Sequence, residues 1–402
     1  MSNAERVFER QAVKNTKASL YNDKHIDFTK EPMFFGKGRN VQRFDVLKYK
    51  NFDKLNDDMQ GFDWKHDEVS LIKDVKDFRY AFKNPEKFVL TRVLQKLIFL
   101  DSLQGRGPFL ILGQIATLPE LENAILTWTY FEAGKHSRTY TEELRALYDH
   151  PDKIFDESFE IPELLELTNS IKNPFERAYF NVINYIYKTQ RDIELTPEET
   201  IELYDSILMV IIEINTLEGI RFYTGFAAIW ALTEGQKYIP GTSENLCFIS
   251  RDENIHLAIS QHLLKNLKKK DEEGFKEYYK AATERIQARY IEVFREEVKW
   301  VDYLFSQGSY LGMNANILKQ YLTFITIKRM KAIGIKVTKE MLDGHWCVVN
   351  PIPWVDKYIN MDSVEKLPQE ENVLNYVTGG VNQDVDESTE IEIALQAVGN
   401  IF

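Results

Sequence analysis

The chain has little of what marks secreted, disulfide-bonded or membrane-spanning proteins. It contains only two cysteines, Cys247 and Cys347, which are far apart and outside any CxxC pattern, so neither a disulfide framework nor a structural zinc site is expected. No apolar run approaches the ~20 residues that span a bilayer. The opening residues MSNAERVFERQ also lack the apolar core of a signal peptide. The sequence therefore predicts a cytoplasmic protein with reduced thiols and no membrane partner.

Positive charge is also in deficit. The 50 lysines and arginines are outnumbered by 62 acids, which gives a net charge of −12. Nonspecific binding to nucleic acid depends on neutralising phosphates with basic side chains, so no nucleic-acid partner is expected.

Motifs of several enzyme classes are missing as well: there is no GxSxG, and Gly36-Lys37-Gly38 is too short for a phosphate-binding loop.

Helical periodicity, by contrast, is present along most of the chain, and alternating strand patterns are nearly absent. One start signal is especially complete, because Thr196-Pro197-Glu198-Glu199 combines a capping box with a first-turn proline. The run that follows is too apolar for a surface helix. Helices are predicted at about 84–105, 117–148, 161–189 with an interruption at Asn173-Pro174, from 196 onward, from 242 onward, and within 275–305 and 314–333.

The two ends of the chain differ from its middle. Residues 1–65 are polar with a weak helical pattern, and 265–274 is most simply a solvated turn. Beyond about 362 the sequence is acidic and interrupted by Gly379-Gly380, a composition typical of a segment that orders only on a partner. We therefore predict an all-α chain, with a single helical domain over 1–362 and a mobile acidic tail over 363–402.

Four acids stand inside apolar helical stretches, where an isolated carboxylate is costly to bury. Two of them have a histidine one turn along, which places carboxylate and imidazole on one helix face. Two carboxylate helices and two carboxylate–histidine helices form the ligand set of a dinuclear iron or manganese site in a four-helix bundle. Two divalent ions would also neutralise the four carboxylates. The acids are Asp101, Glu132, Glu218 and Glu253, and the histidines are His136 and His256.

Chance and structural pairing also explain such spacings, which alone are weak evidence for a metal site. With 62 acids in 402 residues, about two histidines are expected to have an acid at i−3 or i−4, and the chain has three, including Asp63–His66. Glu218 could instead pair with Arg221 one turn on, and Asp101 could be a helix-end residue that faces solvent. From spacing alone, the metal site and a structural explanation both stay open.

The segments around these acids resemble the small subunit of class I ribonucleotide reductase. The matches follow the family's order from about Phe62 to Tyr376. The resemblance implies a ferritin-like helical bundle, usually a homodimer, in which the six acids and histidines bind two iron ions, with manganese possible and oxygen as the oxidant. The matching stretches are LDSLQGRGP (100–108), HSRTY (136–140), LEGIRFY (217–223), RDENIHL (251–257) and NPIPW (350–354).

The resemblance also implies a radical site. Tyr140 stands where the family keeps its radical tyrosine, four residues after His136. Phe222, Phe226 and Ile249 match the apolar pocket around that tyrosine. Such a pocket is physically reasonable, because a phenoxyl radical lasts longer where water and reductants have no access.

A route out of the site is implied in the same way. Trp64 resembles the tryptophan that relays electrons, and Asp252 resembles its hydrogen-bond partner. Tyr376 resembles the tyrosine that passes the radical to the large subunit, on which the tail docks. The implied activity is that of a ribonucleoside-diphosphate reductase, which makes deoxyribonucleotides and works only with its large subunit. A ferritin-like di-iron oxidase, oxygenase or iron-storage protein is the alternative; it would share the ligands but would not need Trp64, Tyr140 and Tyr376 together.

One departure from the family concerns the first ligand helix. The family commonly spaces its first glutamate and histidine by three, with an aliphatic residue before the histidine, whereas Glu132 and His136 are four apart and Lys135 precedes the histidine. A regular helix would place the two ligands a full turn apart along its axis. We therefore predict a π-bulge within about one turn of Gly134, with both ligands on one metal and Lys135 reaching solvent or an acidic partner.

Overall fold

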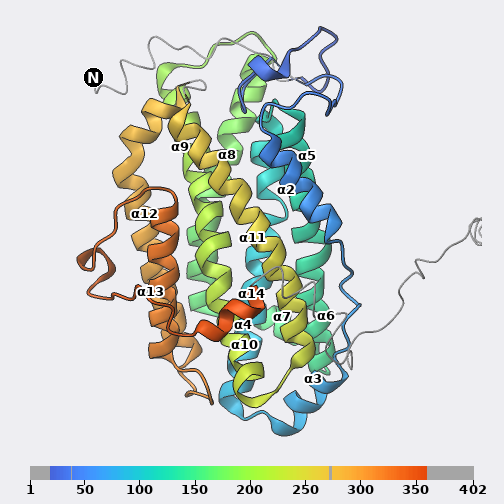
Figure 1. Cartoon of the computed structure of the whole chain (residues 1–402), viewed down its shortest axis with the longest axis vertical. Coiled ribbons are helices and arrows are strands. Elements are labelled where there is room, and N and C mark those ends of the chain that lie inside the picture. Colours follow the sequence, from blue (N-terminus) through green and yellow to red (C-terminus); the bar gives the residue numbers. More distant parts are fainter. Residues whose placement is uncertain (1–18, 38, 271–273, 360–402) are drawn as a thin grey trace, which may run out of the picture.

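The computed structural model describes residues 19–37, 39–270 and 274–359. Within these ranges the chain is helical and has no strand, only two isolated bridges, Phe34–Ala116 and Tyr310–Met313. The long helices lie side by side along the longest axis of the molecule (Figure 1). The prediction of an all-α bundle is confirmed. Among the described residues, no helix is both long and apolar enough to cross a membrane.

The bundle is made of long helices. The long elements are α4 (Asn84–Gln104), α5 (Pro119–Phe131) with η4 (Glu132–His136) and α6 (Ser137–Leu147), α8 (Pro162–Thr189), α9 (Pro197–Thr216) with η5 (Leu217–Arg221) and α10 (Phe222–Gln236), α11 (Pro240–Lys269), α12 (Phe275–Leu304) and α13 (Ala315–Ala332). The short ones are η1 (Phe28–Lys30), α2 (Lys50–Gly61), α3 (Ile72–Lys76), η2 (Asp77–Ala81), η3 (Phe109–Gly113), α7 (Pro151–Ser158), η6 (Glu340–Leu342), η7 (Pro353–Val355) and α14 (Asp356–Ile359). A π-helical turn joins α5 to α6, and another joins α9 to α10.

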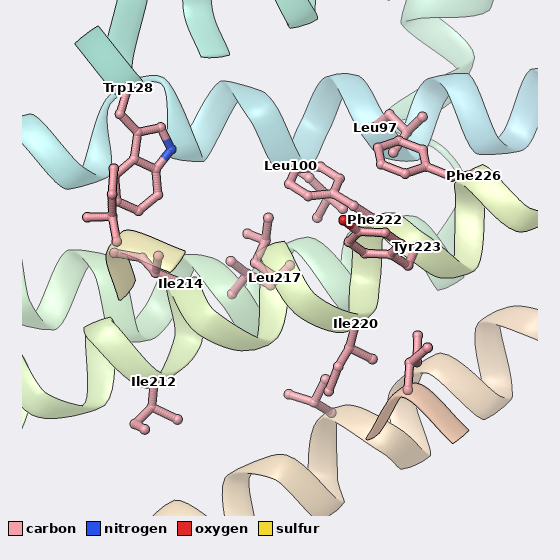
Figure 2. Packing of buried hydrophobic residues seen from close by; sticks show 14 of the residues in the cluster. Leu97, Leu100, Trp128, Ile212, Ile214, Leu217, Ile220, Phe222, Tyr223 and Phe226 are labelled. Atoms are coloured by element: carbon pink, nitrogen blue, oxygen red, sulfur yellow. The ribbon is translucent and has the colours of Figure 1, made fainter. Parts of the chain in front are cut away.

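The helix α9 and its continuation α10 form the centre of the bundle. The capping box predicted at its start is present: Glu199 N donates to Thr196 Oγ1 at 3.2 Å, and Thr196 N donates to Glu199 Oε2 at 2.7 Å. Every residue from 210 to 232 is buried, as the apolar sequence predicted. Figure 2 shows one side of this core, where Leu97 and Leu100 of α4 lie against Phe222 and Phe226 of α10.

The interruption predicted at Asn173-Pro174 is wrong, because α8 continues through Pro174. Proline has no N–H to donate to the carbonyl four residues earlier, which is that of Ser170. Arg289 of α12 supplies donors at this position: its Nη2 lies 3.4 Å from Ser170 O and 2.9 Å from Ser170 Oγ. A guanidinium distant in sequence therefore satisfies the carbonyl that the proline leaves free.

Two other ranges are more helical than predicted. Within 265–274, α11 continues to Lys269, because Leu267 is fully buried and holds the last turn against the bundle. Within 1–65, α2 packs against α5 and α11 and buries Phe52 and Met59. The predicted tail at 363–402 lies outside the described residues, so the domain division stays a prediction.

Candidate metal centre

Six side chains from four helical segments meet inside the bundle, and all of them are fully buried. Asp101 comes from α4, Glu132 and His136 from η4, Glu218 from η5, and Glu253 and His256 from α11. Their potential ligand atoms form two groups, each lying within 4.8 Å of one another: one is Asp101, Glu132, His136 and Glu253, and the other is Glu132, Glu218, Glu253 and His256. Glu132 and Glu253 belong to both groups, so each would help to hold both ions.

The π-bulge predicted near Gly134 is confirmed, since η4 spans Glu132–His136. The extra residue is accommodated so that Glu132 Oε2 lies 3.3 Å from His136 Nδ1. Glycines allow close packing around this turn. A Cβ at Gly134 would lie 3.1 Å from the Tyr130 ring, and a Cβ at Gly105, which ends α4, would lie 2.9 Å from Cβ of Ala133. Both ligands therefore face the same group of atoms, as the prediction requires.

The π-helical turn η5 carries Glu218 and was not predicted. π-Helical turns often occur at functional sites, and of the four in the described residues, two, η4 and η5, bear three of the six candidate ligands. Each has a glycine one or two residues after its acid, Gly219 in η5 and Gly134 in η4. That glycine is the signal in the sequence that could have indicated the second turn.

Several neighbours orient the carboxylates. Trp128, labelled in Figure 2, donates from Nε1 to Glu132 Oε1 at 2.9 Å, and Gln104 donates from Nε2 to Glu218 Oε1. His256 Nδ1 lies 2.9 Å from Glu253 Oε2 and 3.0 Å from Glu132 Oε1. Sequence reasoning missed Gln104 and Trp128. For Trp128 the available signal was its spacing, four residues before Glu132. Gln104 binds Glu218 on another segment, so spacing along one helix does not indicate this contact.

The donor set fits two divalent metal ions. Both oxygens of Asp101 and one oxygen of Glu218 are buried without a hydrogen bond of good geometry from any described residue. Leaving buried carboxylate oxygens unpaired is costly, and a cation removes that cost. Carboxylates with some imidazole suit iron or manganese better than the metals that prefer thiolates.

Protonation compensates for some of the crowded negative charge. Burial, assisted by the charges of Glu132 and Glu253, raises the pKa of Asp101 and of Glu218 well above the usual carboxyl range. Burial alone would lower the pKa of His136, but the charge of Glu253 and the hydrogen bonds to carboxylates raise it well above its usual value. In the metal-free protein, protons on these groups therefore offset part of the negative charge, as expected for four acids brought together.

The residues proposed around the radical site are buried with it. Tyr140 on α6 is fully buried, and burial together with the charge of Asp101 raises the pKa of its phenol well above the usual value. Phe222, Phe226 and Ile249 are also fully buried and belong to the same hydrophobic core. The Phe222 and Phe226 rings are stacked with centroids 5.9 Å apart. Tyr140 thus stays a neutral phenol, buried near Asp101 and within the hydrophobic core.

A continuous polar path leads from the acids to Trp64. Trp64 Nε1 donates to Asp252 Oδ2 at 2.7 Å, and the same oxygen lies 3.1 Å from His136 Nε2. The Trp64 and His136 rings are also nearly parallel, with centroids 6.1 Å apart. Trp64 is only 4% exposed. Tyr376, the proposed end of the path, lies outside the described residues.

The two structural alternatives for the acids are wrong. Arg221 does not pair with Glu218, because its guanidinium contacts Glu296 at 2.5 Å and Glu297 at 3.4 Å. Asp101 does not face solvent. The acid at 218 is therefore not the partner of Arg221, and the acid at 101 is not a surface residue.

Comparison with known proteins agrees with this geometry. The family model described as "Ribonucleotide reductase, small chain" matches residues 43–338, well over half of the chain. The chain is 35% identical over 364 residues to the ribonucleoside-diphosphate reductase subunit beta of Buchnera aphidicola subsp. Baizongia pistaciae, covering 89% of this chain and 94% of the relative. It is 32% identical over 366 residues to ribonucleoside-diphosphate reductase 1 subunit beta of Escherichia coli O157:H7, covering 90% and 95%.

A solved structure extends the likeness to three dimensions. The ribonucleotide reductase R2 subunit from Clostridium botulinum superposes with a TM-score of 0.70 at 25% identity, over 86% of this chain and 99% of that one. Family, relatives and fold point to the same assignment, and they do not favour the iron-storage or oxygenase alternative. The chain belongs to the ribonucleotide reductase small-chain family, as the radical-generating small subunit of a class I enzyme.

Proposed function

We propose that the six buried acids and histidines bind two metal ions and that Tyr140 carries the radical generated there. The observation that supports this most strongly is the pair of ligand groups that share Glu132 and Glu253, together with the two Asp101 oxygens, which no described residue binds with good hydrogen-bond geometry. Two divalent ions would neutralise the four carboxylates, which form no ion pair with a lysine or arginine among the described residues. Iron is the first choice and manganese the second, since this donor set suits both.

When bound, the metals would supply oxidising power drawn from oxygen, and the protein would direct it to one phenol. The Tyr140 phenol is neutral and buried, so its oxidation removes a proton as well as an electron. The apolar side chains of Phe222, Phe226 and Ile249 would keep water and reductants away from the product. The protein's contribution is therefore to hold the ligands, exclude water and choose the residue that is oxidised.

We further propose that the radical leaves through His136, Asp252 and Trp64 to Tyr376 and then to the large subunit. The hydrogen bonds on either side of Asp252 Oδ2 support the first part of this route. The acidic tail at 363–402 would dock on the large subunit, and the subunit would act as a cytoplasmic homodimer. Reduction of ribonucleotides would then take place in the large subunit.

Metal content tests the ligand assignment. Protein reconstituted anaerobically should contain about two transition-metal ions per chain, as this architecture binds. Glu218→Ala should lower the count sharply because it removes a buried ligand. Glu166→Ala is the matched control, since Glu166 is an exposed glutamate whose side chain is 66% accessible. Full occupancy in the Glu218 variant would contradict the assignment.

Electron paramagnetic resonance tests the radical separately from the metal. Tyr140→Phe removes one oxygen and keeps the ring, so this variant should bind metal normally but lose the tyrosyl signal and all reductase activity with the large subunit. Tyr187→Phe, at a tyrosine that is 52% exposed, is the control and should keep both. An iron-storage or oxidase protein would oxidise metal equally well without Tyr140. An unchanged radical signal would show that another residue is oxidised.

Truncation tests the proposed docking of the tail. A chain that ends at residue 382 should keep its metal, radical and thermal stability, because polar tails contribute little to a core. Reductase activity with the large subunit should vanish, and a peptide of residues 383–402 should inhibit the full-length protein. Normal activity of the truncated chain would mean that another surface makes the contact.

A further inference from the structure

Lys135 is a buried cation beside the tryptophan at the end of the proposed route. Its side chain is only 4% exposed, which is rare for a lysine. The ammonium contacts the carboxylate of Asp63 and donates to the backbone carbonyl of Trp64. It also lies 5.7 Å from the centroid of the Trp64 ring and 4.5 Å from that of Phe131. The cation is therefore held against Trp64 by both the backbone and the aromatic rings.

The π-helical turn explains why a lysine can occupy this place. Within η4, Glu132 and His136 face the acids, while Lys135 between them reaches the segment that contains Asp63 and Trp64. The predicted acidic partner of Lys135 is thus Asp63. The same extra residue that keeps the two ligands together also places a positive charge on the Trp64 side of His136.

The charges around Trp64 do not cancel evenly. Asp63 is 66% exposed, so water screens its carboxylate, whereas Lys135 is desolvated. On the other edge of the indole, Asp252 accepts the Nε1 proton, and Arg251 Nε lies 3.6 Å from Asp252 Oδ1. The Lys135 ammonium lies over the Trp64 ring. The field that the ring experiences from this side is therefore positive.

We propose that Lys135 is a positioning residue that makes Trp64 harder to oxidise, and this rests on the proposed role of Trp64 as a relay. Loss of an electron leaves positive charge on the indole, which a cation at this distance opposes. The attraction between the ammonium and the electron-rich ring face is lost in the same step. Lys135 would thus hold Trp64 reduced until the oxidising power of the centre is sufficient.

The step is balanced by groups already described. One electron would leave the Trp64 indole for the oxidant that the metal centre of this subunit would supply. The Nε1 proton moves along the 2.7 Å hydrogen bond to Asp252 Oδ2, which leaves a neutral indole radical. Loss of that proton removes the repulsion between the indole and Lys135, but the attraction of the ammonium for the electron-rich ring is still lost. The cation therefore opposes both routes, and it opposes formation of an indole radical cation more than coupled loss of electron and proton.

A purely structural role for Lys135 makes a different prediction. If the ammonium only ties the Trp64 segment to η4, then Lys135→Met and Asp63→Asn should impair Trp64 in the same direction. If the charge acts on the ring, the two variants should have opposite effects. Lys135→Met removes the charge and keeps a long side chain among the rings, whereas Asp63→Asn removes the carboxylate that partly offsets the cation.

Ultraviolet difference spectra of the metal-free full-length protein test the field directly. A charge fixed near an indole shifts its absorption band, so Lys135→Met should shift the spectrum and Lys135→Arg should restore it. In protein that also carries Trp64→Phe, Lys135→Met should no longer shift the spectrum. Lys299→Met, at a lysine whose side chain is 68% exposed, is the matched control and should leave the spectrum unchanged. No shift, or a shift that persists without Trp64, would overturn the proposal.

Freeze-quench paramagnetic resonance of the reconstituted protein tests the consequence. Oxidation of Trp64 after addition of oxygen should be roughly tenfold faster in Lys135→Met and slower than wild type in Asp63→Asn. Equal slowing in both variants would support a structural role and overturn the proposal. If Trp64→Phe shows wild-type radical kinetics, the proposed relay itself is wrong, whereas an absent spectral shift refutes only the assignment of Lys135.

Discussion

Two buried clusters of acids meet at η5 and differ in how the protein balances them. Glu218 belongs to the candidate metal centre, where four carboxylates are accompanied by two histidines. Arg221, three residues later, belongs to what we call the ionic cluster, which also contains Lys96 and Arg289 with Glu213, Glu296 and Glu297. Its cations are close to its acids: Lys96 Nζ lies 2.7 and 2.8 Å from the two oxygens of Glu297.

The pKa values of the acids separate the two clusters. Burial and neighbouring carboxylates raise the pKa of Asp101 and Glu218. Burial alone would raise the pKa of Glu296, but the charges of Arg221 and Arg289 outweigh it and lower this pKa. Burial lowers the pKa of Lys96 to about 8, but Glu297 holds it from falling further. Burial of an acid therefore does not by itself indicate a metal site; what separates these two clusters is whether lysine or arginine side chains lie beside the acids.

The largest expected effect comes from breaking the ionic cluster. Glu297→Ala leaves Lys96 buried without its carboxylate, which should lower the free energy of unfolding of the metal-free protein by about 3–5 kcal/mol. Denaturant titration measures this loss, with Glu166→Ala as the exposed control. Correctly folded Glu297→Ala protein should still bind two metals. A loss below about 1 kcal/mol would mean that the cluster is hydrated or rearranges.

The metal centre should respond to substitution in its affinity for metal. Glu253→Gln keeps the shape of a side chain that both ligand groups share but removes its charge. Affinity for at least one ion should fall by about 100-fold or more, since changes to groups that merely orient ligands already cost 10–100-fold. Competition with a chelator measures the affinity. An unchanged affinity would remove Glu253 from the ligand set.

Raising the pH should weaken the metal-free protein. Above 4.5, the ordinary pKa of Glu218, the unfolded carboxyl has lost its proton while the folded one still holds it, so unfolding releases protons. His136 acts in the same direction, because the stability from its raised pKa is lost as the pH rises through the folded value. Each group contributes up to about 1.4 kcal/mol per pH unit. Thermal unfolding measured between pH 5 and 8 should show this loss of stability with rising pH, and metal loading should reduce it. A stability that rises with pH would contradict the raised pKa values of Glu218 and His136.

The smallest expected effect is a change in the free energy of unfolding when one glutamate is replaced by glutamine. This change should have opposite signs in the two clusters. Glu218→Gln removes one acid from the crowded centre, so the metal-free variant should be more stable than wild type at pH 7, by about 1 kcal/mol. The equivalent change in the ionic cluster, Glu297→Gln, should destabilise. Denaturant titration of both metal-free variants measures the contrast. If both are destabilised, the acids of the centre are better compensated than their pKa values indicate.

Local rules explain why so much could be predicted from the sequence. Proline and a capping box marked the start of α9, and the extra residue between Glu132 and His136 predicted the π-turn at Gly134. The errors occurred where a distant residue decides. Pro174 should interrupt α8, but Arg289 satisfies the freed carbonyl. The short polar helix α2 is stabilised by packing on α5 and α11, which periodicity does not report.

By itself the sequence determined most of the helices and their order. It also determined which helix faces carry both a carboxylate and a histidine, because this depends only on spacing along one helix. The tertiary structure alone decided which acids lack a cation. Glu218 and Arg221 are one turn apart and could pair, yet the packing of α12 gives Arg221 to Glu296 and Glu297 and leaves Glu218 to the metal centre. Compensation of a buried charge depends on residues far apart in the chain, so only the folded bundle determines it.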